Sequence, residues 1–329
     1  MASDYNTFPM AERPKIVGHQ VILDELIQDL TVQNLAHAYL FTGPRHLGKM
    51  AVARWFAEQL LTDGVQEEKL ADVRRNIVRL THPDLLILDQ LWIEGACEDW
   101  GVIAHTSNAP QQHRARKPAA KTDTISIDDI RALQERLHET GTGRFRCCII
   151  RAAERMQVTA ANAFLKILEE PPEGLVFILT TRSASLLLPT IVSRARALRF
   201  QRLPHRELLP LLEGCAAVDR QFILRVAQGA PGVVARLVQD PDQLREHKLV
   251  HEQALAFWGV ATLADRLRIL QPLQKRSADA ERLLLHLALA LRERKTALAY
   301  MREFQQFAQG LQTNAHRQLL TQRFALSIE

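Results

Sequence analysis

The sequence predicts an α/β domain, with a parallel sheet and helices on both faces, followed by a region built only of helices. Two observations indicate this fold class. Up to about residue 200, short apolar segments alternate with segments whose apolar residues recur at helical spacing. Strands that alternate with crossover helices form parallel sheets covered on both faces. Beyond that point the strand-like segments end, and the helical spacing continues.

The individual elements follow from local patterns of apolar residues. Short apolar runs predict five strands, at 38–43, 84–89, 146–150, 175–181 and 197–203. Helical spacing predicts four helices around them, at 16–34, 49–61, 126–140 and 159–172. Ser126 is the expected N-cap of the third helix, and two prolines end the fourth. Residues 92–124 fit no periodic pattern and are interpreted as a surface insertion.

The length of 329 residues is enough for two or three domains. The α/β domain is expected to span residues 1–200. Short helical segments, broken at "GAPG" in residues 229–232, predict a small helical domain over 201–241. Uniform helical spacing predicts a larger, all-α domain over 242–329.

Composition argues against a membrane protein or a secreted one. The chain is 47% hydrophobic and 24% charged, which is ordinary for a soluble globular protein. Its apolar run "LLLHLALAL", residues 283–291, is too short to span a bilayer. The N-terminal residues lack the basic and apolar regions of a secretory signal. A cytoplasmic protein without membrane association is expected.

The cysteines and the basic residues bear on metal and nucleic-acid binding. None of the four cysteines belongs to a C-x-x-C pair, so neither a zinc ribbon nor a redox pair is indicated. The spacing of Cys97, His105 and His113 fits no common zinc pattern. The net charge of +5 permits contact with nucleic acid. The basic run "HRARKPAAK", residues 113–121, is either a solvated loop or a DNA-binding arm.

One segment comes close to a phosphate-binding loop. Residues 37–50, "HAYLFTGPRHLGKM", follow the pattern G-x-x-x-x-G-K-[ST] at Gly43, Gly48 and Lys49. Backbone N–H groups at a helix N-terminus and the lysine are suited to bind phosphate. Met50 occupies the position of the hydroxyl that would hold Mg²⁺, and its soft sulfur is a poor magnesium ligand.

The second metal-binding position is also changed. A carboxylate is expected at the end of a neighbouring strand, but Arg151 and Ala152 follow the strand at 146–150. The nearest acid, Glu154, comes too late. Departures at both positions predict no metal site and argue against ATP hydrolysis by this chain. Weak binding of ATP or ADP without magnesium stays open, since a helix N-terminus binds anions without a metal.

Six segments occur in order over residues 16–200: "IVGHQ", "LAHAYLFTGPRHLGK", "HPDLLIL", "ISIDDIRAL", "AANAFLKILEEPP" and "TIVSRARALRF". Together they resemble the AAA+ ATPase domain of bacterial clamp-loader subunits, and "LEEPP" is the most distinctive part. The segments "GAPGVVARLV" and "NAHRQLLTQRFALSI" resemble the lid and collar domains of the family. The resemblance implies a RecA-like AAA+ domain over 1–200, a lid over 201–241, and a collar over 242–329 that forms the main oligomerisation surface.

Within this family, the gamma and tau motor subunits keep a complete phosphate loop and acidic pair, whereas the delta-prime subunit often has a degenerate nucleotide site. Met50, Arg151 and Ala152 resemble the delta-prime pattern. Gly232 stands where many members carry a nucleotide-sensing arginine in the lid. Many relatives also carry a four-cysteine zinc module, but residues 51–81 contain no cysteine. No zinc is therefore expected there, and the segment folds either without metal or as a helix.

The resemblance also implies an arginine finger. Ser193, Arg194 and Ala195 match the family's Ser-Arg-Cys motif, whose arginine reaches the γ-phosphate held by a neighbouring subunit. The guanidinium group is suited to phosphate oxygens. An arginine finger supplied in trans contributes about 10³–10⁵ in rate. The alternatives are that Arg194 only ends a strand within a solvated basic edge, or that Arg196 takes the role.

These observations give a leading hypothesis and two alternatives. The first is a non-hydrolysing subunit of the DNA polymerase III clamp loader, in a ring with gamma/tau ATPase subunits and the delta subunit. It would offer Arg194 to a neighbour and help to load the sliding clamp onto primed DNA through contacts to the sugar–phosphate backbone. The loop would then be kept for the fold and the subunit interface, with Lys49 in a structural role. The alternatives are an active ATPase that uses Glu154 as a displaced acid, and a DNA-binding adaptor centred on residues 113–121.

Overall fold

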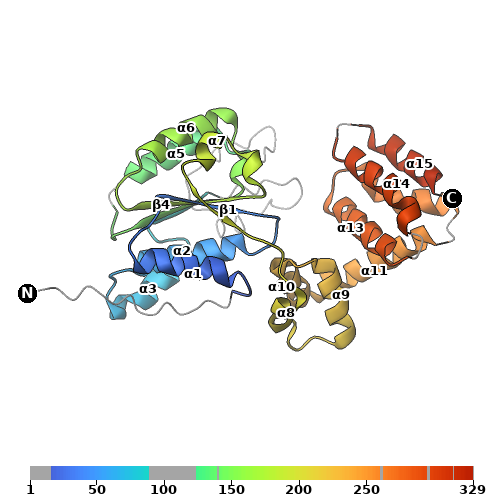
Figure 1. The fold of residues 1–329 in the computed structure, drawn as a ribbon, viewed down its shortest axis with the longest axis horizontal. Helices are drawn as coiled ribbons and strands as arrows, with labels where there is room; N and C mark the ends of the chain where they lie inside the picture. Colours follow the sequence, from blue (N-terminus) through green and yellow to red (C-terminus); the bar gives the residue numbers. More distant parts are fainter. Residues whose placement is uncertain are drawn as a thin grey trace, which may run out of the picture. The chain divides into compact units, whose positions relative to one another are not determined.

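Five short strands form one parallel sheet in the computed structural model (Figure 1). The strands are β1 (Ala38–Thr42), β2 (Leu85–Leu88), β3 (Arg146–Ile150), β4 (Leu175–Thr181) and β5 (Arg196–Arg199). Their order across the sheet is β2-β3-β4-β1-β5, and each neighbouring pair is parallel. β4 is buried at every position, as expected for a central strand that is covered on both faces.

Helices cover both faces of this sheet (Figure 1). One face carries α1 (Gln20–Thr31), α2 (Lys49–Thr62) and α3 (Glu67–Val78). The other carries α5 (Ile127–His138), α6 (Val158–Glu169) and α7 (Pro189–Val192). Single 3₁₀ turns are η2 (Ala153–Arg155) and η3 (Ala184–Leu186). The predicted parallel sheet with helices on both faces is confirmed.

The structure describes residues 16–88, 124–138, 141–259, 262–294, 297–313 and 315–328. The predicted insertion at 92–124 lies outside these ranges except for its last residue. The basic run at 113–121 and the residues Cys97, His105 and His113 also lie outside them.

Local chemistry fixes where the helices of the sheet domain begin and end. The backbone N–H and the hydroxyl of Ser126 both donate to Asp129 Oδ2, at 2.8 and 2.9 Å, in a capping arrangement before α5. The backbone N–H of Asp129 donates in turn to the Ser126 hydroxyl oxygen at 3.4 Å, which confirms the predicted N-cap at Ser126. α6 ends at Glu169, because Pro171 and Pro172 cannot continue a helix.

The chain divides into two compact units, Met1–Leu203 and Pro204–Glu329, and the described residues of the second unit are helical or irregular. Its α-helices are α8 (His205–Leu208), α9 (Ala217–Ala227), α10 (Pro231–Gln239), α11 (Pro241–Trp258), α12 (Leu263–Leu270), α13 (Ala278–Arg292), α14 (Ala297–Gly310) and α15 (Arg317–Ser327). Its 3₁₀ helices are η4 (Leu209–Leu212) and η5 (Gln271–Gln274). Within the described ranges, no helix combines the length and the apolar composition that crossing a bilayer requires.

The junction between α10 and α11 is short. α10 starts at Pro231, inside the predicted break at 229–232, because proline is favoured in the first turn of a helix. Asp240 alone separates α10 from α11 and caps α11 by accepting from the backbone N–H groups of Asp242 and Gln243. A domain boundary at 241 stays a prediction.

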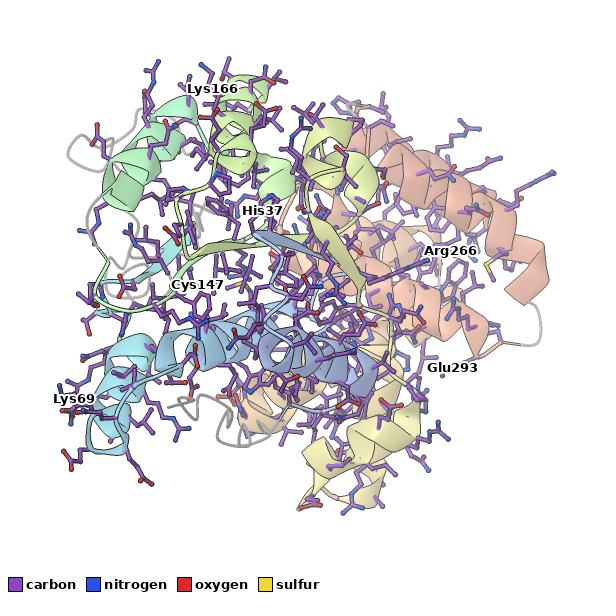
Figure 2. The ribbon with its side chains drawn as sticks, turned by 60° about the vertical axis from the view of Figure 1, so that its left-hand side comes forward. His37, Lys69, Cys147, Lys166, Arg266 and Glu293 are labelled. Carbon is purple, nitrogen blue, oxygen red and sulfur yellow. The ribbon has the colours of Figure 1, made fainter. Side chains whose placement is uncertain are left out.

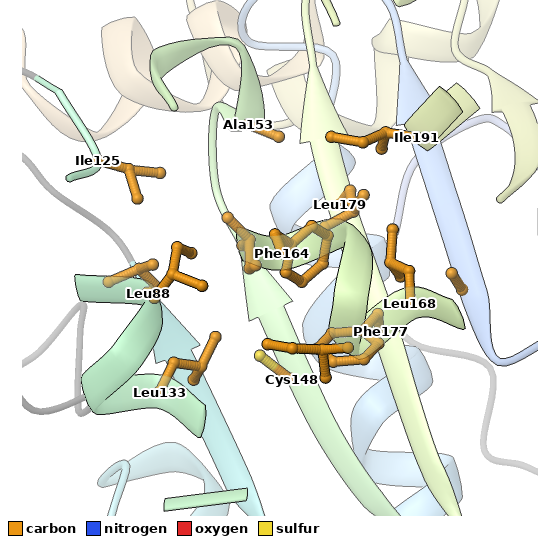
Figure 3. Packing of buried hydrophobic residues seen from close by; sticks show 14 of the residues in the cluster. Leu88, Ile125, Leu133, Cys148, Ala153, Phe164, Leu168, Phe177, Leu179 and Ile191 are labelled. Atoms are coloured by element: carbon orange, nitrogen blue, oxygen red, sulfur yellow. The ribbon is translucent and has the colours of Figure 1, made fainter. Parts of the chain in front are cut away.

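One core lies between the sheet and the layer formed by α5 and α6 (Figure 3). Phe164 of α6 meets Phe177 of β4 edge to face, with ring centroids 5.1 Å apart. Cys147 and Cys148 are both buried in β3, and this burial raises the pKa of each thiol. Figure 2 shows Cys147 at the sheet, with Lys166 on the outer side of the α6 layer. The two cysteines therefore pack as small apolar residues, as predicted.

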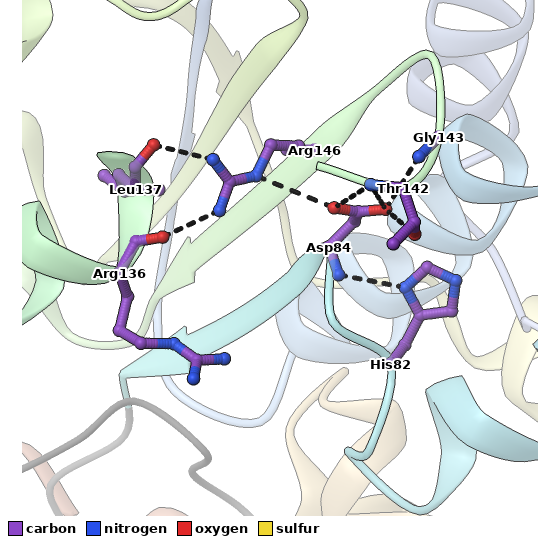
Figure 4. A network of polar contacts seen from close by, with 7 residues as sticks. All are labelled: His82, Asp84, Arg136, Leu137, Thr142, Gly143 and Arg146. Carbon is purple, nitrogen blue, oxygen red and sulfur yellow. Dashed lines mark hydrogen bonds and ion pairs between the residues drawn. The ribbon is translucent and has the colours of Figure 1, made fainter. Parts of the chain in front are cut away.

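A buried polar network closes the amino edge of β2 and β3 (Figure 4). Asp84 precedes β2 and accepts hydrogen bonds from the backbone N–H groups of Thr142 and Gly143, each at 3.0 Å. Arg146, the first residue of β3, donates to the carbonyl oxygen of Leu137 in α5 at 2.6 Å. These contacts join the turn before β3 and the end of α5 to the sheet, which gives Asp84 a structural role.

Three histidines pack together inside the second unit. His247 and His251 lie on α11, and His247 Nδ1 is 2.8 Å from Nε2 of His286 on α13. Phe222 of α9 stacks on the His286 ring, with centroids 6.1 Å apart. Burial, together with neighbouring basic groups that include Arg282, lowers the pKa of His286 to about 3 and that of His247 to about 4. These two histidines are therefore neutral at pH 7.

We expect the free energy of unfolding to fall as the pH drops below about 6.5. An unfolded histidine titrates near that value, whereas buried His286 stays neutral, so the unfolded chain binds more protons in acid. Moving from pH 7.5 to pH 5 is expected to cost about 2 kcal/mol through His286. Urea unfolding at the two pH values measures the difference. His286→Gln should weaken the pH dependence, and His205→Gln, at an exposed position, should not. An unchanged pH dependence in His286→Gln would contradict this account.

Candidate functional site

The carboxyl ends of β3, β4 and β1 meet at one edge of the sheet, since these strands are parallel neighbours. The loop that contains Gly43 and Gly48 follows β1, and Arg151 and Ala152 follow β3. Arg182 comes directly after β4. The structure therefore brings the loop and the changed metal position after β3 to the edge at which open α/β sheets bind ligands.

Both glycines of the loop have structural reasons to be glycine. Gly43 has a φ of +143°, and a Cβ added there would lie 2.4 Å from the carbonyl oxygen of Phe200. Gly48 has a φ of +87° at the N-cap position of α2, with open space where a Cβ would be. The close approach of the chain after β5 thus requires Gly43, and a left-handed backbone favours Gly48. Neither requirement involves a ligand.

His19 fastens the loop to α1. It occupies the N-cap position of this helix, and its Nε2 lies 2.8 Å from the carbonyl oxygen of Leu47 in a buried contact. The centroids of the His19 and Phe200 rings are 4.7 Å apart. The sequence patterns assigned no role to His19, and its only signal is its place in "IVGHQ" directly before a helix.

Lys49 binds its own loop. Its Nζ donates to the carbonyl oxygens of Gly43 and Pro44, at 2.5 and 2.6 Å. Burial lowers the pKa of Lys49 to about 8; Glu154 acts against this shift, and Arg151 adds to it. The ammonium group therefore closes the loop on itself, and this geometry supports a structural role for Lys49.

The residues at the two magnesium positions cannot act as ligands for that ion. Met50 is the second residue of α2 and offers only a thioether. Ala152 has a left-handed φ of 52°, and its N–H donates to Thr180 Oγ1 at 3.0 Å. Arg151 places a guanidinium group where a carboxylate is needed. A cation at this position repels a metal ion.

Glu154, the displaced acid, is already paired. Its side chain is 7% exposed, and its Oε1 accepts from Arg182 Nε at 2.9 Å. The ion pair neutralises the carboxylate at the same edge of the sheet. In the part of the chain that the structure describes, no group of three or more His, Cys, Asp or Glu side chains is arranged to hold a metal ion.

Residues 67–78, in the segment where relatives carry a zinc module, form the helix α3. This helix packs on α2, and Arg74 Nε lies 3.0 Å from Glu58 Oε1. The sequence left open whether this segment is a module that folds without metal or a helix, and the structure shows a helix.

Arg194 lies on the surface just after α7. Its Nη1 donates to the carbonyl oxygen of Thr190 at 3.1 Å, and its Nη2 lies 2.9 Å from Glu169 Oε1. Its side chain is 37% exposed. Ser193 is the C-cap of α7, and its hydroxyl also donates to Thr190. Ala195 packs against the core beneath the helix.

Arg196 is engaged inside its own unit. It is the first residue of β5, and its guanidinium group contacts both carboxylate oxygens of Asp29 and lies 3.4 Å from Glu25 Oε2. Asp29 is buried and also accepts from the Tyr39 hydroxyl at 2.8 Å. Arg196 therefore ties α1 to the sheet. Its side chain is 37% exposed, as that of Arg194 is, but it contacts two carboxylates of this chain, whereas Arg194 contacts one.

Arg194 lies at the amino end of the strands, and the loop lies at their carboxyl end. β5 runs parallel to β1, with Arg196 paired to Tyr39 near the start of β1. The loop begins where β1 ends, beside Phe200. At about 3.3 Å per strand residue, the length of β5 separates Arg196 from Phe200 by roughly 13 Å, and Arg194 lies further back along the chain.

Comparison with known proteins identifies the family. A family model described as "DNA polymerase III, delta subunit" matches residues 18–204, which is more than half of the chain. The chain belongs to the DNA polymerase III clamp-loader family. Its relatives include delta-prime and gamma/tau subunits, as the sequence motifs predicted.

Two curated relatives show the extent of the similarity. The chain is 34% identical over 163 residues to the delta-prime subunit of Pseudomonas aeruginosa, across 48% of this chain and 41% of that protein. It is 28% identical over 277 residues to the gamma/tau subunit of Mycobacterium tuberculosis, across 79% of this chain and 42% of that protein. The chain thus spans about two-fifths of the length of these curated relatives.

A solved structure supports the fold. The gamma subunit-related protein of Thermotoga maritima superimposes with a TM-score of 0.52 at 18% identity, across 92% of this chain and 98% of that one. The predicted AAA+ core, followed by a helical C-terminal region, is confirmed.

The two loop glycines are expected to differ in their tolerance of alanine. Gly43→Ala should destabilise the chain by about 3 kcal/mol, because a new Cβ meets backbone at 2.4 Å in a disfavoured conformation. Gly48→Ala meets open space and should cost only about 1 kcal/mol, for its backbone conformation. Urea unfolding of both variants measures the difference. An equal loss of stability in the two variants would show that the close approach of Phe200 is not what requires glycine at position 43.

Proposed function

We propose that this chain is a non-hydrolysing subunit of the DNA polymerase III clamp loader that completes the active site of a neighbouring ATPase. The observation that carries the proposal is the position of Arg194. The residue is partly exposed, and it lies at the opposite edge of the sheet from the chain's own loop. A phosphate that Arg194 reaches therefore belongs to another molecule.

The residues beside the loop, at the carboxyl ends of the strands, support the proposal that this chain does not hydrolyse ATP. Phosphoryl transfer needs a bound magnesium ion and a residue that positions the attacking water. Met50 and Arg151 stand at the two magnesium positions, and Glu154 is paired with Arg182. No cofactor or zinc is required by this proposal. ATP or ADP would bind weakly, without magnesium, through Gly43, Gly48 and Lys49.

The proposed partners follow from the family. Gamma/tau ATPase subunits and the delta subunit would complete a ring with this chain, joined mainly through the collar at 242–329. The assembly would act in the cytoplasm, where it would load the sliding clamp onto primed DNA. Basic residues of the α/β domain would contact the DNA backbone and not the bases. Ser193 would help to hold the turn that presents Arg194, since both donate to the carbonyl oxygen of Thr190.

Two alternatives are separable by experiment. An active ATPase that uses Glu154 would require breaking the contact with Arg182, and the chain alone would then hydrolyse ATP. A DNA-binding adaptor would require salt-dependent DNA binding by the chain alone, lost on deletion of residues 111–121.

Arg194→Ala is expected to lower ATP hydrolysis by the reconstituted loader, with clamp and primed DNA present, by at least about tenfold. The reason is that a finger contributes about 10³–10⁵ at the site it serves, and we expect the ring to complete a loading cycle only after that site has turned over. Steady-state phosphate release measures the rate. Arg75→Ala, at an exposed arginine of α3, is the matched control and should leave the rate unchanged.

The chain alone should release no phosphate from ATP under the same conditions. Robust hydrolysis by the isolated chain, or an Arg194→Ala loader as active as the native one, would contradict the proposal.

A further inference from the structure

Arg194 is held at both ends of its guanidinium group by this chain. Nη1 donates to the carbonyl oxygen of Thr190 at 3.1 Å, and Nη2 lies 2.9 Å from Glu169 Oε1. The backbone beneath it is fixed, because Ile191 is buried in the core and Ala195 packs against that core. Glu169 is the acid that gives this arginine an ion pair within its own unit.

Glu169 occupies a position where an acidic residue is unfavourable by itself. It is the last residue of α6, and the partial negative charge of a helix C-terminus repels a carboxylate. Pro171 and Pro172 end the helix directly afterwards and restrict the chain that carries Glu169. A guanidinium group beside this carboxylate offsets the repulsion.

We propose that Glu169 is a positioning residue for Arg194, which it holds in one orientation for the phosphate of the neighbouring subunit. The inference rests on the proposed function of Arg194 as a finger in trans. Arginine has a long side chain with many rotamers, and a catalytic group gains most when its orientation is fixed before the reaction. Glu169 and Thr190 together restrict those rotamers.

The ion pair can orient Arg194 and still leave its guanidinium group able to bind a phosphate. Its side chains are 37% exposed at Arg194 and 51% exposed at Glu169, and exposed pairs of this kind are weak. A phosphate, with its higher charge, therefore competes successfully for the guanidinium group. Glu169 remains beside it as a second partner.

The test uses the reconstituted loader with its ATP-hydrolysing partner subunits, clamp and primed DNA. Glu169→Gln should lower kcat by about two- to fivefold with KM unchanged, which is the effect expected for an exposed ion pair. Glu169→Asp, which keeps the charge, should recover part of the loss. Glu170→Gln, at the adjacent exposed glutamate, is the matched control and should behave as the native chain.

A double-mutant cycle separates positioning from a structural role. In an Arg194→Ala background, Glu169→Gln should have no further effect on kcat, since there is no arginine to orient. An equal loss in both backgrounds, a higher rate in Glu169→Gln, or no change while Arg194→Ala is impaired would each overturn the inference and leave the finger in place. An Arg194→Ala loader with native activity would instead overturn the proposed function, and the inference with it.

Discussion

The parallel pairing of β1 with β5 is the constraint on which the rest of the arrangement depends. It places the end of β5 beside the end of β1, where Phe200 leaves Gly43 no room for a side chain. It also places the start of β5, and Arg194 just before it, at the other edge of the sheet. The pairing of β1 with β5 thus explains both the shape of the loop at Gly43 and the distance between this loop and Arg194.

The loop is held by contacts within the chain, and Met50 and Arg151 stand at the two positions where magnesium ligands would be expected. His19, Phe200 and the carbonyl oxygens bound by Lys49 hold the turn by contacts within the chain. Glu154, the acid that follows β3, is paired with Arg182 and so is not free to bind Mg²⁺. Selection on the fold alone is sufficient to retain glycines that, by sequence, look like a nucleotide site.

Much of the fold could be predicted because its signals are local. Apolar runs and helical spacing gave the five strands and the helices α1, α2, α5 and α6, and the proline pair gave the approximate end of α6. The short helix α7 was not predicted, and for α3 the sequence left two foldings open. The contacts of His19, Glu169 and Asp29 could not be predicted, because each is made with a residue far away in the sequence. The contacts of Arg196 with Asp29 and Glu25 likewise needed the structure, since these residues are far from Arg196 in the sequence.

The most direct measurement counts the ADP molecules that aluminium fluoride traps in the assembled loader. This reagent with ADP mimics the transferring phosphoryl group, and transition-state mimics bind tightly only where the catalytic groups are complete. The native complex should trap more nucleotide than a complex with Arg194→Ala, by the one site that this arginine completes, and the isolated chain should trap none. Equal trapping by the two complexes, or trapping by the chain alone, would contradict the central claim that this chain serves only the site of its neighbour.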